Sequence, residues 1–135
     1  MPENNQATLT VRLTTGGGAI PIEGGVVRLS GNQPENESYD LSQLTDRAGI
    51  ARFSGIPTPD IEGSLSPGAP GPAYYTYTLE IFKEGYFAVI IRNISFFEGI
   101  ETIQKIDLVP YATFDGQPEY PRDRIVIDSA ENTDL

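Results

Sequence analysis

The longest uninterrupted run of strand-forming residues in this chain reads YTYTLEIFKEGYFAVIIRNIS, from Tyr75 to Ser95. Its first arm alternates between apolar and polar residues, the period of two that is typical of a half-buried strand. Lys83-Glu84-Gly85 interrupts the pattern, and Tyr86–Ile91 follows with apolar residues on both faces. A strand that is apolar on both faces belongs in the middle of a sheet or beneath another layer. The stretch therefore predicts a hairpin whose second arm is the spine of a β-sandwich.

Five further strand signals occur along the chain, separated by residues that favour turns. The sequence has no internal repeat and no convincing helix-period segment. Strand signals that recur with turns between them are typical of an all-β chain, and we expect an antiparallel β-sandwich of about seven strands. The five runs are Ala7–Thr14, Val26–Leu29, Tyr39–Thr45, Ile50–Phe53 (ending at Gly55-Ile56-Pro57) and Ile100–Val109.

Two of these connections have local signals of their own. Thr45–Gly49 reads TDRAG, in which an Asp that bonds to its own backbone and a Gly suited to a left-handed position predict a tight turn. A calcium loop would need more oxygen ligands than this segment supplies. In the last run the apolar positions move from Ile103 to Ile106, and this change of face predicts a bulge near Gln104-Lys105.

The composition argues against several classes of function. The 135 residues include no Cys and no His, which excludes disulfides, the common zinc sites and histidine-based catalytic triads. A formal net charge of −10 argues against a nucleic-acid partner. A carboxylate pair is the remaining route to acid–base catalysis, but Glu80 and Asp107, which lie on strands with their side chains expected to face solvent, are not paired by anything in the sequence. We therefore expect no enzyme, no catalytic residue, no cofactor and no metal site.

The sequence divides into three parts. Residues 1–6 are a polar arm without the features of a signal peptide, residues 7–110 carry the β-sandwich domain, and residues 111–135 are a polar tail. No run approaches the roughly 20 apolar residues of a membrane span, so we expect no membrane insertion. Within the tail, Ile125, Val126 and Ile127 predict an edge strand at 124–128 that docks on its own sandwich or on a neighbouring copy. The alternative is a mobile tail.

A recognition surface is predicted beside the Pro/Gly-rich segment Thr58–Ala73, which is long for a connection in a compact domain and is therefore functional or mobile. Aromatic rings that follow it suit sugar rings or a protein partner. The alternation favours a core position for Tyr75 and Tyr77, which leaves Tyr74 as the exposed ring. The predicted ligand or partner surface comprises Tyr74, Tyr75, Tyr77, Pro70 and Pro72.

The carboxypeptidase-regulatory-like domains are resembled by four segments of this chain, which occur in the order Leu9–Val11, Ile20–Val27, Leu44–Pro57 and Leu79–Tyr86. These domains are prealbumin-like (transthyretin-like) seven-stranded β-sandwiches. A version found beside peptidoglycan-binding and spore-associated proteins of Gram-positive spore-formers is similar in Ser64–Pro72 with Tyr74-Tyr75, and in Phe97–Gln104. The resemblance covers about residues 7–110 and implies a structural or binding module that accompanies an enzyme.

From the resemblance and the missing catalytic residues we expect a non-enzymatic structural or binding module of the cell wall or spore surface. Its partner would be a protein or a cell-wall glycan, with self-association through the C-terminal tail as a further route. Two alternatives remain open. One is a carbohydrate (peptidoglycan)-binding adaptor that uses Tyr74 and the Ser64–Ala73 loop, and the other is a subunit of a phage or fibre assembly.

Overall fold

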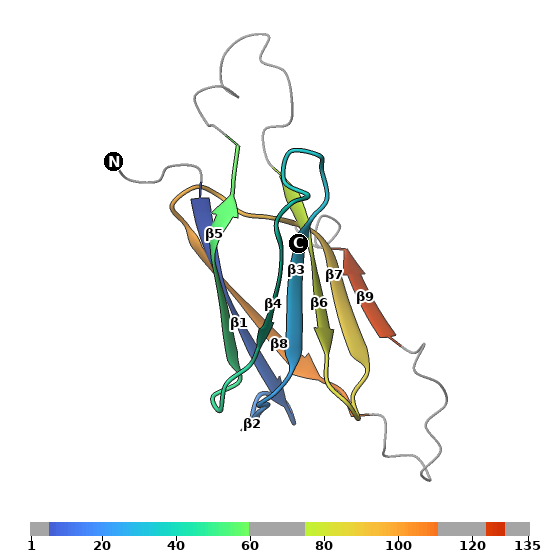
Figure 1. The fold of residues 1–135 in the computed structure, drawn as a ribbon. Coiled ribbons are helices and arrows are strands. Elements are labelled where there is room, and N and C mark those ends of the chain that lie inside the picture. The colour runs from blue at the N-terminus through green and yellow to red at the C-terminus, as the bar shows by residue number, and fades with distance from the viewer. Residues whose placement is uncertain (1–5, 60–74, 111–123, 129–135) are drawn as a thin grey trace.

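Two β-sheets pack against each other in the structure, a computed structural model that describes residues 6–59, 75–110 and 124–128 (Figure 1). The predicted all-β sandwich is confirmed for these residues. None of them forms a helix long and apolar enough to cross a membrane. The strands are β1 (Gln6–Thr15), β2 (Ile20–Pro21), β3 (Val26–Gly31), β4 (Asp40–Leu44), β5 (Ile50–Pro57), β6 (Thr76–Phe82), β7 (Ala88–Ser95), β8 (Glu101–Leu108) and β9 (Arg124–Asp128).

Strand β1 lies at the centre of the four-stranded sheet. It pairs with β5 in antiparallel orientation, with the short β2 at Thr14 and Thr15, and with β8 in parallel orientation. The parallel pairing joins Thr14 to Asp107, which lies 93 residues later in the sequence. No local sequence pattern predicts a pairing between residues so far apart. The structure is therefore antiparallel in most pairings but not in all.

The second sheet has five strands in the order β4-β3-β6-β7-β9. The predicted hairpin is confirmed as β6 and β7, and the strands that flank it are β3 on one side and β9 on the other (Figure 1). Strand β9 runs parallel to β7 and pairs Val126 with Ile90. The described residues form more strands than the expected seven. The two additional strands are β2, which has only two residues, and β9, which lies in the C-terminal tail.

A β-bulge extends β5 beyond its predicted end. Ala7 pairs with Ile56 and Leu9 with Phe53, so β5 carries one extra residue, and Gly55 there has a φ of 65°. Glycine adopts this left-handed conformation without a steric cost. Both Phe53 and Ile56 consequently point into the core, and β5 continues to Pro57.

The second sheet contains a corresponding bulge in β7. Between Tyr77 and Leu79 on β6, the partner strand β7 advances from Ile94 to Ile91. Asn93 there has a φ of 64°, a conformation that Asn tolerates better than most residues. The extra residue keeps both Ile91 and Ile94 in the core.

The prediction of a bulge near Gln104-Lys105 is wrong. Strand β8 pairs with β1 without a register shift from Glu101 to Leu108. The alternation is unbroken, but Ile103 lies on the outward face and is 61% exposed, whereas Gln104 lies on the inward face and is half-buried. The apparent change of face comes from an exposed isoleucine and not from backbone geometry.

The core fills the space between the two sheets. Its largest fully buried side chain is Tyr77, whose ring contacts those of Tyr39 and Phe96 edge-on, with centroids 6.0 and 5.4 Å away. The other core residues come mainly from the inward faces of β1, β5, β6 and β7.

The predicted turn at Thr45–Gly49 is present. Oδ1 of Asp46 accepts hydrogen bonds from the amides of Ala48 and Ile50, both at 2.9 Å. Gly49 has a φ of 80°, as the turn requires. Main-chain amides thus occupy the carboxylate oxygen that a calcium loop would need.

Candidate binding surface

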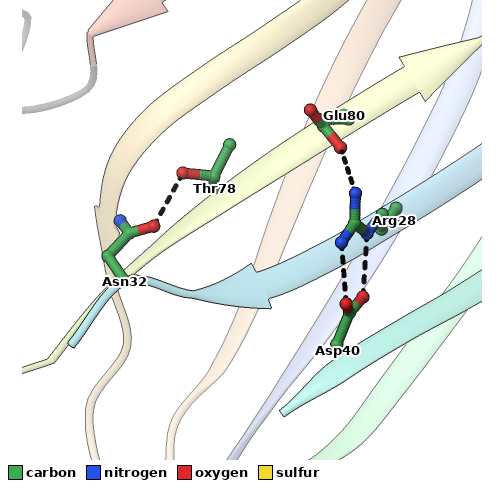
Figure 2. Close-up of polar contacts among 5 residues, drawn as sticks. All are labelled: Arg28, Asn32, Asp40, Thr78 and Glu80. Carbon is green, nitrogen blue, oxygen red and sulfur yellow. Dashed lines mark hydrogen bonds and ion pairs between the residues drawn. The ribbon is translucent and has the colours of Figure 1, made fainter. Parts of the chain in front are cut away.

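The outer face of the five-stranded sheet carries a row of charged side chains. Figure 2 shows Arg28 of β3 between Asp40 of β4 and Glu80 of β6. Nε and Nη2 of Arg28 donate to the two carboxylate oxygens of Asp40 at 2.8 and 2.7 Å. Nη1 donates to Oε1 of Glu80 at 3.2 Å. One guanidinium therefore joins three neighbouring strands.

The electrostatic effects follow from these contacts. The hydrogen bond from Arg28 holds the pKa of Asp40 below its ordinary value, and the same bond raises the pKa of Arg28. All three side chains are roughly half exposed, where ion pairs contribute little to stability. Their principal effect is geometric: the bidentate contact fixes the guanidinium plane against the Asp40 carboxylate, and a single further bond orients the guanidinium towards Glu80.

Hydroxyl and amide groups continue the row along the same face. Thr78 Oγ1 donates to Oδ1 of Asn32 at 2.9 Å, and Nδ2 of Asn32 donates to Oγ1 of Thr76 at 3.0 Å (Figure 2 shows the first contact). Beneath them the buried Asn36 anchors the β3–β4 connection by donating to the carbonyl of Thr76. The polar groups are thus held in place before any ligand arrives.

Apolar side chains occupy the other end of this face. Phe82 is 55% exposed, and its register partner Val26 and the next residue across, Leu44, are exposed too. A groove of about 270 Å³ lies at the boundary between the apolar and charged ends, and its lining includes Phe82, Arg28, Ser42, Glu80, Val26 and Ile90. An aromatic ring beside fixed polar groups is an arrangement that binds a ring with one apolar face and polar edges.

The predicted tyrosine surface is only partly described. Tyr77 is buried in the core, because its position in the alternation faces the other sheet, and it offers no exposed ring. Tyr75 is half-buried and packs against the core. Tyr74, Pro70 and Pro72 lie outside the described residues.

The predicted edge strand lies where the five-stranded sheet ends. Ile125, Val126 and Ile127 belong to β9, which is paired with β7 of the same chain. Val126 is exposed on the outer face, and Ile127 packs against the core.

A second groove, of about 490 Å³, lies on the outer face of the four-stranded sheet. Arg12 and Lys105 line it beside Asp107. Oδ1 of Asp107 accepts hydrogen bonds from Oγ1 of Thr14 at 2.8 Å and from the Gly18 amide at 2.9 Å, and Oδ2 accepts one from Gly17. The hydrogen bond from Thr14 and those from the two amides lower the pKa of Asp107. This carboxylate holds in place the turn between β1 and β2 that contains Gly17 and Gly18, called here the glycine turn.

Within residues 6–59, 75–110 and 124–128, no three acidic, His or Cys side chains gather where they could hold a metal ion. Glu80 and Asp107 lie on different sheets, so the structure does not bring them together as an acid–base pair.

The charged row and Phe82 were missed in the sequence. Phe82 follows Glu80 by two residues in β6, so the strand alternation alone places its aromatic ring on the same polar face as Glu80. Arg28 and Asp40 carry no comparable signal, because only the register between β3 and β4 brings them together.

No family model and no curated protein matches this chain. Solved structures do resemble it. The TIE protein of Bacillus anthracis aligns with a TM-score of 0.55 and 14% identity over 78% of this chain and 17% of that chain. A 3-chlorocatechol 1,2-dioxygenase from Rhodococcus opacus aligns with a TM-score of 0.54 and 13% identity over 80% of this chain and 61% of that one.

A candidate carbohydrate-binding protein from Bacteroides uniformis aligns with a TM-score of 0.52 and 8% identity, over 78% of this chain and 42% of that chain. The chain thus spans less than two thirds of the length of each of these three proteins. At such identities the likeness is one of fold, and the fold is a β-sandwich.

The prediction that the chain is not an enzyme is contradicted by these likenesses. A hydroxyquinol 1,2-dioxygenase and several catechol 1,2-dioxygenases share the fold, so enzymes are among its users. The prediction failed because it inferred the class of function from a missing set of residue types. A fold hosts unrelated functions, and function has to be argued from the surface.

Proposed function

We propose that this chain is a carboxypeptidase-regulatory-like binding module of the cell wall or spore surface, and that the outer face of its five-stranded sheet recognises a carbohydrate. The observation that carries the proposal is the groove in which the exposed ring of Phe82 lies beside Arg28, Ser42 and Glu80. A cell-wall glycan presents the matching chemistry, since each sugar ring has an apolar C–H face and hydroxyls at its edge.

The charged row makes the site rigid. Asp40 holds the guanidinium of Arg28 through two hydrogen bonds, and Arg28 in turn contacts Glu80. A sugar whose apolar face stacks on Phe82 would find the Glu80 carboxylate already bonded to Arg28, and the Ser42 hydroxyl in the same groove, as partners for its own hydroxyls. Binding to groups held in this way costs less ordering entropy than binding to free side chains.

Two likenesses support the proposal. One structural neighbour is itself a candidate carbohydrate-binding protein, and the match to the Bacillus anthracis TIE protein covers only 17% of that longer chain, as expected of a module. The resemblance of Leu44–Pro57 and Leu79–Tyr86 to carboxypeptidase-regulatory-like domains points to the same kind of accessory role.

Co-sedimentation with purified peptidoglycan tests the proposal. We expect the wild-type chain to bind, and Phe82→Ala to weaken binding about tenfold, because loss of an aromatic stacking contact costs on the order of 1 kcal/mol or more. Phe97→Ala is the matched control: Phe97 is as exposed as Phe82 (56% against 55%) but lies outside the groove, and its loss should leave binding unchanged.

Three outcomes would count against this site. Equal losses in the two Phe variants would mean that binding depends on general hydrophobicity. Loss in Tyr74→Ala with retention in Phe82→Ala would move the site to the Ser64–Ala73 segment. Absence of glycan binding, together with sedimentation of the protein alone as polymers, would favour a subunit of a phage or fibre assembly.

A further inference from the structure

Strand β8 forms an outer edge of the four-stranded sheet. It pairs with β1 along one side, and no described strand pairs with its other side. The strand at the opposite edge, β5, is protected because side chains bond to its main-chain carbonyls. The hydroxyl of Tyr39 donates to the carbonyl of Ser54, and Nε2 of Gln43 donates to the carbonyl of Arg52. An uncovered edge presents backbone N–H and C=O groups to a further strand.

The outward side chains of β8 are Glu101, Ile103, Lys105 and Asp107. Ile103 is 61% exposed, an unusual position for an isoleucine in the middle of a strand. Glu101 and Lys105 stand four residues apart, about 13 Å along an extended chain, so they cannot pair with each other. Glu101 accepts one hydrogen bond, from Thr10 to Oε2 at 2.8 Å.

The neighbour of Lys105 across the sheet is a second cation. Lys105 and Arg12 are register partners, and neither forms an ion pair with any described residue. Like charges side by side on one face of a sheet destabilise it. Asp107 lies near them on this face, but it accepts hydrogen bonds from Thr14, Gly17 and Gly18 and forms no ion pair with either cation.

We propose that β8 pairs in antiparallel orientation with β8 of a second copy of this chain, about a two-fold axis at Ile103. In this register Glu101 of each copy faces Lys105 of the other, and the two Ile103 side chains meet at the centre. Lys105, which forms no ion pair with any described residue, then has the Glu101 carboxylate of the second copy as its direct cross-strand neighbour. Such an interface is isologous, with the same surface on both partners.

Other registers lack this complementarity. A two-fold axis at Gln104 would set Glu101 opposite Asp107, and an axis at Lys105 would set two lysines opposite each other. The axis at Ile103 also places the two exposed isoleucine side chains opposite each other. The charges and the apolar side chains therefore select the same pairing.

Analytical ultracentrifugation over a range of protein concentrations tests the dimer. We expect wild type to dimerise, and Glu101→Lys or Lys105→Glu to weaken dimerisation about tenfold or more, because each swap turns two attractive contacts into repulsive ones. The double variant Glu101→Lys/Lys105→Glu should dimerise again. An equimolar mixture of the two single variants should form a heterodimer, since acidic pairs in one copy then face basic pairs in the other.

Lys83→Glu is the matched control for Lys105→Glu, because it makes the same change in net charge in the β6–β7 turn, outside β8, and should leave dimerisation unchanged. Restoration in the double variant and in the mixture separates lost association from a failure to fold. Monomeric wild-type protein at millimolar concentration would overturn the proposal. So would a dimer that ignores both swaps but disappears on truncation after Tyr120, which would place the contact on β9. The proposal goes beyond glycan binding, which uses the other sheet.

Discussion

Tyr77 of β6 donates a hydrogen bond from its phenolic oxygen to the main-chain carbonyl of Pro57 at the end of β5, and so joins the two sheets through the core. Burial raises the pKa of Tyr77 to about 12. The folded state therefore holds the phenol neutral at a pH where the unfolded chain, with an ordinary tyrosine pKa of about 10, releases the proton. Stability from this group is fully present below pH 10 and is lost as the pH rises towards 12.

Urea unfolding between pH 8 and pH 12 should show this loss, at roughly 2 kcal/mol in the free energy of unfolding. Tyr77→Phe should be about 1 kcal/mol less stable than wild type at pH 8, because the carbonyl of Pro57 loses its donor, and should depend less on pH above 10. Burial also raises the pKa of Tyr39, which is present in both proteins. Identical pH dependence in the two proteins would contradict the assignment to Tyr77.

Asp107 predicts the opposite pH dependence at the acid end. Its pKa is lowered by the hydrogen bond from Thr14 and by those from the Gly17 and Gly18 amides. A carboxyl whose folded pKa is depressed stabilises the fold above its unfolded pKa, and this contribution is lost as the pH falls below about 4.

Melting temperatures from pH 6 to pH 2 should therefore fall less steeply in Asp107→Asn than in wild type. Asp40, whose pKa the hydrogen bond from Arg28 lowers, contributes in the same direction and is intact in both proteins. Parallel curves would show that the glycine turn does not depend on the charge of Asp107.

The hydroxyl of Thr45 is the polar group whose loss we expect to cost the most. It is buried, donates to the carbonyl of Ile22 at 2.7 Å and accepts from the amide of Gly25 at 2.8 Å. Thr45→Val keeps the shape and leaves both main-chain groups unsatisfied, so we expect a loss of about 2–3 kcal/mol in urea unfolding.

Thr10→Val is the matched control for this substitution. Thr10 lies on an outward face and bonds to Glu101, so its replacement should cost well under about 1 kcal/mol. Similar losses in the two variants would show that the Thr45 bonds contribute no more than an exposed one.

Removal of residues after Tyr120 tests the position of β9. Because β9 pairs with β7 of the same chain and Ile127 packs against the core, truncation should lower the melting temperature, and the decrease should not depend on protein concentration. Loss of assembly without loss of stability would place β9 on a neighbouring copy. Unchanged stability and unchanged oligomeric state would contradict docking altogether.

Sequence patterns predicted the elements whose signal is local. The alternation in β1 and β6 assigned each side chain to the correct face, and the TDRAG turn was recognised from residues that bond to one another. The β5 bulge was missed because Ser54-Gly55 resembles the end of a strand. Only pairing with Ala7 at the other end of the sheet shows that β5 continues.

The candidate site was harder to predict for the same reason. Arg28 and Glu80 are 52 residues apart and meet only through the register of β3 with β6. The predicted surface was based on tyrosine chemistry. The alternation of β6, however, turns the odd-numbered Tyr77 into the core and the even-numbered Phe82 towards solvent. The position of a residue in the strand alternation therefore indicated the outer face better than its residue type did.

The parallel pairing of β1 with β8 has a consequence for biosynthesis. During translation β1 leaves the ribosome long before its partner, since Thr14 must wait for Asp107, 93 residues later. Until then the central strand of the four-stranded sheet lacks the partner that satisfies one of its two sides. Contacts this distant in sequence form late and make folding slow. The nascent chain is therefore most vulnerable to aggregation just before its eighth strand emerges, and substitutions in β8 should reduce the yield of folded protein more than their effect on final stability suggests.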